Sequence, residues 1–375
     1  MKRILITIGS YFPGYKIGGP AITIKNLIYM FKDRKDLEFF IYCPNHDWAE
    51  TKPYENIKSD SWVQYDNCKV FYASEKCFNA KFFKSIICDF DVIYCTGAFT
   101  PFAIAAGKYA KKHKDKKVIV APMGSFFKGV LKSKRLKKTL FFAYTKAFNV
   151  FRNCIWSVTS IEEKDATESL FGKKAKIVIA EDAISFEDAI LVQRQNVDDV
   201  LRVVHLSRIH EKKGLLTCIN ILKMCHSKII FDVYGTIENE SYFNECINRA
   251  KTLPSNIIFS YKGTFRPDEV TSIFAKYDVF LFPTFSENFG HVIFESLKSS
   301  CVPMISDNTP WSNLQKENCG FVIPLSNLEL YATRLDEVAK YKCEELNKMK
   351  KACYLFAENK FNNAVKESAY EVFFR

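Results

Sequence analysis

Apolar residues in the first half of the chain fall into short runs separated by longer mixed segments. The runs are RILITIG (3–9), EFFIYCP (38–44), CKVFYA (68–73), DVIYCTG (91–97) and KVIVAPMG (117–124). Continuous apolar runs of this length are typical of strands buried on both faces, whereas segments 21–31 and 102–111 have helical spacing. The alternation predicts a parallel sheet with helices on both faces.

The second half repeats this scheme, with predicted strands at 201–207, 228–235, 256–263, 278–283, 302–306 and 320–324. A polar segment, 184–200, interrupts the alternation and is the predicted linker. We therefore expect an α/β protein of two doubly wound, Rossmann-like domains, 1–183 and 201–355, facing each other across a cleft. A length of 375 residues agrees with two domains. The stretch from Leu346 to Arg375 is predicted to be helical, with about 356–375 packing back on the first domain.

The composition, with 48% apolar and 26% charged residues, is that of a globular protein, and the cysteine usage and N-terminus described next lead us to expect a cytoplasmic one. Thirteen cysteines, an odd number without CxxC spacing, argue against a disulfide framework or a zinc ribbon. The start, MKRILITIGSYFPG, is interpreted as a first strand rather than a signal peptide, because a cleavage site and a full apolar region are missing. No window reaches the roughly 18 apolar residues that span a bilayer.

The formal net charge of +12 is concentrated in one segment. Between Lys108 and Arg152 the chain has fourteen Lys or Arg and a single acid, Asp115. Such a stripe, interleaved with phenylalanines, indicates a polyanion or the anionic inner face of the cytoplasmic membrane as a partner. A merely solvated basic face is the alternative.

Two loops at predicted strand ends carry charged residues suited to ligand binding. In HLSRIHEKKG, Arg208 and Lys213 follow a strand and precede a helix predicted from Leu215. A planar guanidinium and a mobile ammonium together suit a pyrophosphate, although a solvated basic turn is also possible.

The second loop, SENFGHVIFE, places Glu287 before a predicted helix and Glu295 about one turn inside it. Gly290 allows the backbone to approach a ligand, and the first-turn N–H groups suit a phosphate or a sugar hydroxyl. The carboxylates can accept hydrogen bonds from vicinal hydroxyls. The alternative is that Glu287 caps the helix and Glu295 faces solvent.

A third loop, YFPGYKIGGPA, presents Gly18 and Gly19 after the first strand. It is not GxGxxG, and no acid ends the second strand, so a nicotinamide-dependent Rossmann enzyme is disfavoured.

The three loops in this order resemble the retaining glycosyltransferases of GT-B fold, family 4 (group 1). SRIHEKKG and PTFSENFGHVIFESL carry the resemblance in the second half, from about Leu201 to Pro324. APMGSFFKGVLKSKRLKKTLFF and SDNTPWSNL resemble a subgroup that acts on bacterial surface polysaccharides. The resemblance implies a metal-independent enzyme without a cofactor, which transfers a hexose or N-acetylhexosamine from a nucleotide-diphosphate sugar, with UDP the commonest nucleotide. The implied acceptor is a lipid-linked or growing glycan of an O-antigen, capsule or lipopolysaccharide, and nucleic acid is not an expected partner.

Residue roles follow from the same resemblance. The implied catalytic residues are Arg208, Lys213 and Glu287. The implied donor-binding residues are Gly18, Gly19, Gly235, Phe265, Asn288, Phe289, Gly290, His291 and Glu295, and the implied acceptor-side residues are Met123, Gly124 and Ser125.

The chain also departs from the family pattern. Met123 stands where members often have His or Arg, and AEDAI (180–184) stands where Pro-Asn-Gly is usual. Two alternatives therefore remain: a basic polyanion-binding protein, and a GT-B scaffold without catalytic activity.

Overall fold

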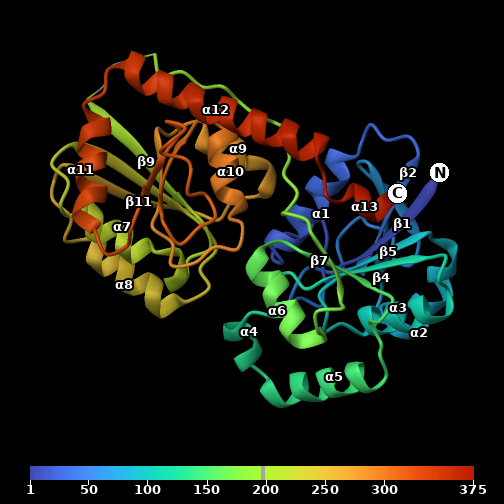
Figure 1. Cartoon of the computed structure of the whole chain (residues 1–375). Helices are drawn as coiled ribbons and strands as arrows, with labels where there is room; N and C mark the ends of the chain where they lie inside the picture. The colour runs from blue at the N-terminus through green and yellow to red at the C-terminus, as the bar shows by residue number, and fades with distance from the viewer. Residues whose placement is uncertain (196–198) are drawn as a thin grey trace. The chain divides into compact units, whose positions relative to one another are not determined.

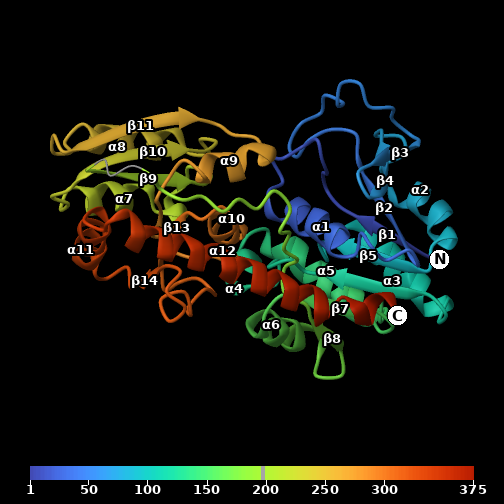
Figure 2. The same cartoon turned by 90° about the horizontal axis from the view of Figure 1, so that it is seen from above.

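The computed structural model describes residues 1–195 and 199–375, which form two compact units. Unit 1 comprises Met1–Ser185 and Asn363–Arg375, and unit 2 comprises Phe186–Asn362. Of the predicted linker 184–200, residues 196–198 lie outside the described residues, and its described part has no helix or strand before Val200. In each unit the helices lie around a central sheet (Figure 1), which Figure 2 shows from above.

The sheet of unit 1 contains the five strands predicted for the first half and three more. Its strands are β1 (Lys2–Thr7), β2 (Leu37–Pro44), β3 (Trp62–Tyr65), β4 (Cys68–Ala73), β5 (Val92–Thr96), β6 (Lys117–Ala121), β7 (Ile155–Val158) and β8 (Lys176–Ile179). They are ordered β3-β4-β2-β1-β5-β6-β7-β8, and every pair is parallel except β3–β4. The strands β3 (WVQY) and β8 (KIVI) are only partly buried and contain polar residues, and β7 (IWSV) contains a serine, so none of the three gives a clear apolar run.

Successive residues of β1 point to opposite faces of this sheet and join two cores. Ile4 and Ile6 pack with the helix α1 (Gly19–Met30), while Leu5 packs with the residues of α2 (Ala80–Ile86) and α3 (Pro101–Lys112). The other helices between Met1 and Ser185 are α4 (Lys128–Lys132), α5 (Arg135–Ala147) and α6 (Ile161–Phe171), together with the turn η1 (Ile87–Asp89). The two-sided burial explains why the strands are almost continuously apolar.

The sequence pattern predicted one helical stretch from Leu346 to Arg375. The structure instead has two helices there. The helix α12 (Cys343–Lys366) begins earlier and ends at Lys366, and α13 (Glu371–Phe374) follows after a break. The break lets Phe374 enter the core of unit 1, where its ring meets those of Phe31 and Phe39 edge-on, at 5.1 and 5.6 Å between centroids. Burial of these aromatic rings outweighs continuation of the helix.

The sheet of unit 2 contains all six predicted strands. They are β9 (Val200–Leu206), β10 (Lys228–Tyr234), β11 (Ile257–Gly263), β12 (Val279–Phe282), β13 (Val302–Ser306) and β14 (Phe321–Ile323), all parallel, in the order β11-β10-β9-β12-β13-β14. The helices that lie wholly within unit 2 are α7 (Leu215–Leu222), α8 (Glu240–Ala250), α9 (Val270–Phe274), α10 (His291–Lys298) and α11 (Leu328–Ala339), with the turns η2 (Glu211–Lys213) and η3 (Pro267–Glu269), and most of α12 also belongs to this unit.

The strand order of unit 2 reverses between β9 and β12, which is the topological switch point of a doubly wound sheet. Ligands of such sheets bind at the carboxyl ends of the strands at this point. The predicted fold class, two α/β domains each with a parallel sheet, is confirmed. Among the described residues, no helix is both long enough and apolar enough to pass through a bilayer.

Candidate functional site

The loops that follow β9 and β12 meet at the switch point of unit 2. The Phe285 N–H and the Thr284 Oγ1 both donate to the carbonyl oxygen of Lys212, at 2.8 and 2.9 Å. Gly214 lies so close that a Cβ on it would be 2.2 Å from the Pro283 carbonyl oxygen. Only glycine permits this approach, and its φ of 79° is also in the left-handed region. The two loops are therefore held in one arrangement by their backbones.

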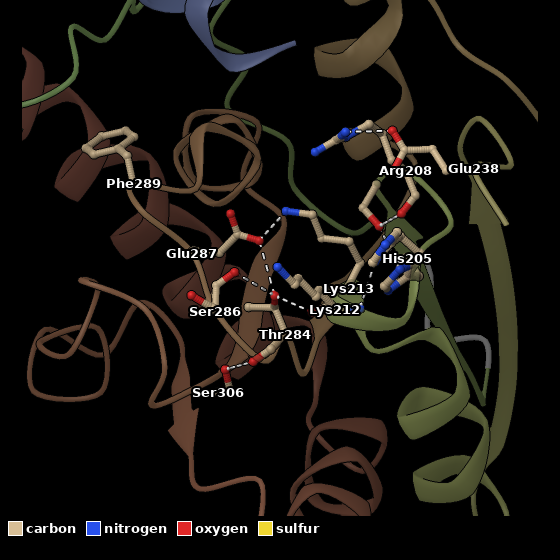
Figure 3. Close-up of polar contacts among 12 residues, drawn as sticks. His205, Arg208, Lys212, Lys213, Glu238, Thr284, Ser286, Glu287, Phe289 and Ser306 are labelled. Carbon is tan, nitrogen blue, oxygen red and sulfur yellow. Dashed lines mark hydrogen bonds and ion pairs between the residues drawn. The ribbon is translucent and has the colours of Figure 1, made fainter. Parts of the chain in front are cut away.

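Lys213 and Glu287, 74 residues apart in the chain, form an ion pair across these loops (Figure 3). The two side chains are only 20% and 10% exposed. The Glu287 Oε1 also accepts a hydrogen bond from the Thr284 Oγ1 at 3.2 Å, and the Lys213 Nζ lies 5.7 Å from the centroid of the Phe282 ring. A shielded ammonium and carboxylate held this way can bind an anionic group and a hydroxyl side by side.

Glu287 does not cap the following helix, so that alternative is wrong. The helix α10 begins after Gly290, whose φ of 81° is left-handed, and no side-chain cap hydrogen bond is present there in the described structure. The Glu287 N–H donates to the carbonyl oxygen of Asn308 at 3.2 Å, which ties the loop to the one that follows β13. The carboxylate is directed to Lys213 instead.

Arg208 is placed away from this ion pair. Its Nη1 lies 2.6 Å from the Oε1 of Glu238, and Figure 3 shows this exposed pair apart from Lys213 and Glu287. The Ile209 N–H donates to the Thr236 carbonyl oxygen at 2.8 Å, which joins the loops after β9 and β10. Exposed ion pairs contribute only ~0–1 kcal/mol, so Arg208 can exchange its partner at little cost. Its diphosphate role stays a prediction.

Gly235 has a structural reason to be glycine. A Cβ at this position would lie 1.7 Å from the carbonyl oxygen of Ser207. Gly235 therefore allows the ends of β9 and β10 to come together beneath the Arg208 loop.

The predicted donor-binding residues around α10 have different environments. Phe289 is buried against Trp311, with 5.2 Å between ring centroids, and its carbonyl oxygen accepts the indole N–H at 2.6 Å. Burial lowers the pKa of His291 to about 4, against an opposing effect of Glu287, so its imidazole is neutral near pH 7. Asn288 is exposed, and Glu295 is half-buried one turn into the helix. Phe265 is half-buried and follows β11, two strands away from β9.

Sequence reasoning missed His205, which lies beneath the two loops. Its Nδ1 is 3.0 Å from the Leu281 carbonyl oxygen, which can only accept, and its Nε2 is 2.9 Å from the Ser207 Oγ. Burial lowers the pKa of His205 to about 4, so the ring is neutral, donates from Nδ1 and accepts at Nε2. A histidine inside the apolar run VVHLS was the available signal.

The predicted residues of unit 1 lie at the carboxyl ends of its strands. Gly18 has a φ of 69° and precedes α1, and a Cβ on either Gly18 or Gly19 would meet open space. Met123 and Gly124 follow β6 with φ of 50° and 77°. The Ser125 Oγ is buried without a hydrogen-bond partner among the described residues.

Sequence reasoning also missed two carboxyl groups of unit 1, the fully buried Glu163 and the partly buried Asp182. Glu163 accepts hydrogen bonds from the Gly124 N–H at 2.5 Å and the Thr159 N–H at 2.9 Å, and burial raises its pKa. Asp182, in the unusual AEDAI segment, accepts a hydrogen bond from the Thr23 Oγ1 at 2.9 Å. Burial raises the pKa of Asp182 to about 6, although the Thr23 hydrogen bond opposes this shift.

Comparison with known proteins agrees with this architecture. Residues 187–355 match the family model described as "Glycosyl transferases group 1". An uncharacterised 41.2 kDa protein in the cps region of Klebsiella pneumoniae is 24% identical over 289 residues, covering 75% of this chain and 77% of that protein.

Solved structures share the fold over nearly the whole chain. Anabaena HepE in complex with UDP and glucose superposes with a TM-score of 0.67 at 14% identity, covering 96% of both chains. The Escherichia coli trehalose-6-phosphate protein bound with UDP-2-fluoro glucose has a TM-score of 0.67 at 11% identity, covering 98% of this chain and 97% of that one. The matched segment contains the whole Lys213–Glu287 site. Residues 187–355 therefore match the group 1 glycosyltransferases, and the chain as a whole has the GT-B fold.

Proposed function

We propose that unit 2 binds a UDP-sugar at the switch point between β9 and β12. The observation that carries this proposal is the shielded Lys213–Glu287 pair next to the start of α10. The first-turn N–H groups of α10 and the ammonium of Lys213 suit the diphosphate, while Glu287 suits a sugar hydroxyl and Glu295 the ribose. The printed descriptions of the Anabaena and E. coli structures, which name UDP and UDP-2-fluoro glucose, support this choice of donor.

The proposed reaction is transfer of a hexose or N-acetylhexosamine with retained anomeric configuration. The bond between the anomeric carbon and the diphosphate oxygen breaks, and the acceptor oxygen bonds to that carbon on the same face. The departing diphosphate takes the proton of the acceptor hydroxyl, so no separate protein base is needed. Negative charge grows on the diphosphate in the transition state, and Lys213, Arg208 and the α10 amides would stabilise it.

The proposed acceptor is a lipid-linked or growing surface polysaccharide of a bacterium, made at the cytoplasmic side. Support comes from the cps-region relative and from the acceptor-side segment of unit 1. Met123, Gly124 and Ser125 are assigned to the acceptor side, where Glu163 fixes the Gly124 backbone.

Isothermal titration with UDP and UDP-glucose tests the donor site. Lys213→Met should weaken UDP binding by about 10–100-fold, because a hydrogen bond to a charged group contributes ~1.5–3 kcal/mol. Lys212→Met is the matched control, since this neighbouring lysine is exposed and contacts Thr284 and Phe285 only through its carbonyl oxygen. Equal effects of the two substitutions would overturn the assignment. Binding of UDP-glucose without sugar release to any glycan acceptor would instead favour an inactive scaffold.

A further inference from the structure

The helix α5 of unit 1 has a second apolar stripe that faces away from the core. At 100° per residue, its packed side holds Phe141, Phe142 and Thr145, which contact or lie within the core. The opposite side holds Leu136 and Leu140, which are 74% and 63% exposed. The helix lies along the outside of the unit (Figure 1). An outward leucine pair of this kind suits a partner that is itself apolar.

Cations flank this stripe, and acids are absent from a long stretch of sequence around it. On the helical wheel Lys137 lies on one side of the leucines, and Arg135 and Lys146 lie on the other. From residue 116 to residue 161 the sequence contains no Asp or Glu. An apolar stripe with cations on both of its flanks is the pattern of a helix that lies in the surface of an anionic membrane.

A pocket of about 780 Å³ lies at the C-terminal end of α5 and is lined by cations and aromatic rings. Its lining includes Lys84, Lys108, Lys112, His113, Tyr144 and Phe148. The Lys108 Nζ lies 5.2 Å from the centroid of the Tyr144 ring, and the rings of Tyr109 and His113 stack at 4.0 Å. The lysines of this lining are exposed, whereas Ile87 and Val150 are buried, and this combination suits an anion that carries a hydrocarbon chain.

This pocket is separate from the acceptor-side residues of unit 1. The helix α3 starts after the carboxyl end of β5 and ends at Lys112, just before β6 starts at Lys117. The pocket therefore lies at the amino edge of the sheet, whereas Met123 and Gly124 follow the carboxyl end of β6. A lipid held in it would anchor the protein and would not be the molecule that receives the sugar.

We propose that α5 and this pocket form one docking surface for an anionic lipid bilayer. Leu136 and Leu140 enter the headgroup region, the flanking cations attract the surface, and a phospholipid phosphate occupies the pocket beside Lys108 and Lys112. The proposal is independent of the donor site in unit 2.

Vesicle co-sedimentation of the full chain tests the docking surface. The chain should bind phosphatidylcholine vesicles that contain ~30% phosphatidylglycerol, bind far less to phosphatidylcholine alone, and lose affinity as salt rises. Lys108→Gln with Lys112→Gln should weaken binding by about 25-fold, or ~5-fold for each cation. Leu136→Ser with Leu140→Ser should weaken it about tenfold or more, because their burial is lost.

Matched controls come from exposed residues elsewhere in the chain. Lys223→Gln with Lys276→Gln, and separately Leu355→Ser in α12, should leave vesicle binding unchanged. Titration of UDP into the Leu136/Leu140 variant should match the parent, which keeps this test distinct from that of the donor site.

Three results would overturn the proposal: equal binding to zwitterionic vesicles, unchanged binding by both surface variants, or equal losses in the controls. A different result would assign the surface to polyanions instead. The chain would then bind a single-stranded RNA oligonucleotide tightly but not vesicles, and RNA binding would require the lysines but not the leucines. Inorganic pyrophosphate, added until it saturates the pocket, should compete with vesicle binding. Unchanged vesicle binding would contradict the proposal that a lipid phosphate occupies the pocket.

Discussion

Replacement of Asp182 by asparagine should stabilise unit 1 near neutral pH. The carboxyl group is partly buried, accepts a hydrogen bond from Thr23 at 2.9 Å and has Glu181 as its charged neighbour in the chain. Burial raises its pKa from 3.8 to about 6, so folding favours the protonated form. An asparagine side chain has nearly the same shape, is always neutral and can still accept from the Thr23 hydroxyl.

The size of the effect follows from linkage between protonation and folding. Between pH 3.8 and about 6 the folded chain binds a proton at Asp182 that the unfolded chain has released. The free energy of unfolding therefore falls as pH rises through this window and is constant above it. A shift from 3.8 to about 6 corresponds to a loss of up to about 3 kcal/mol. Asp182→Asn should recover most of this loss at pH 7.5 and almost none at pH 3.5.

Urea unfolding followed by tryptophan fluorescence measures the difference at both pH values. Trp48, Trp62 and the fully buried Trp156 lie in unit 1 and report on its unfolding. The exposed Asp115 provides a control, Asp115→Asn, which should leave unfolding of unit 1 unchanged at either pH. A destabilised Asp182→Asn protein at pH 7.5, or an effect that is the same at pH 3.5, would refute the reasoning.

Three further predictions concern unit 2. Gly235→Ala should destabilise it by about 3 kcal/mol or more, because the new Cβ would lie 1.7 Å from a carbonyl oxygen; an unchanged urea midpoint would contradict this. His205→Gln should reduce the change in the free energy of unfolding between pH 6.5 and pH 4. The pKa of His205 falls from 6.5 to about 4 on folding, so the free energy of unfolding of the parent protein decreases by about 3 kcal/mol as pH drops through that window. Equal slopes between pH 4 and 6.5 would contradict it. Glu287→Gln should bind UDP more tightly than the parent, by about tenfold, because Lys213 loses its compensating charge; isothermal titration that shows weaker UDP binding would refute this.

The alternation of apolar runs predicted a parallel sheet in each unit, and the strands that it missed in unit 1 have physical causes. Strands buried on both faces must be apolar throughout, so β1, β2, β12 and β13 stand out in the sequence. The edge strand β8 is half exposed and gives no such signal. The break between α12 and α13 is set by tertiary packing of Phe374 against Phe31, which no local pattern contains.

The candidate site shows a similar limit. Loop chemistry placed Lys213 and Glu287 at strand ends, but their pairing depends on β9 and β12 being neighbours, which is a property of the strand order. The partner of Arg208 was not foreseen, because Glu238 follows the strand on the other side of β9. Asp182 and His205 were missed because their burial, and hence their pKa values, depends on packing rather than on a motif.

The two groups of cations in this chain differ in how their charge is balanced, and this difference fits different partners. Lys213 and Arg208 each form an ion pair with a glutamate. A small anion that binds there must displace the glutamate or share the cation with it, so the geometry of the loops decides which anion binds. Around α5 no acid occurs from residue 116 to residue 161. The cations there therefore create a positive electrostatic potential that attracts any densely negative surface. Screening by salt weakens such a field far more than it weakens a shielded ion pair. Salt should therefore separate the two activities, releasing vesicles at concentrations that leave UDP binding by unit 2 nearly unchanged.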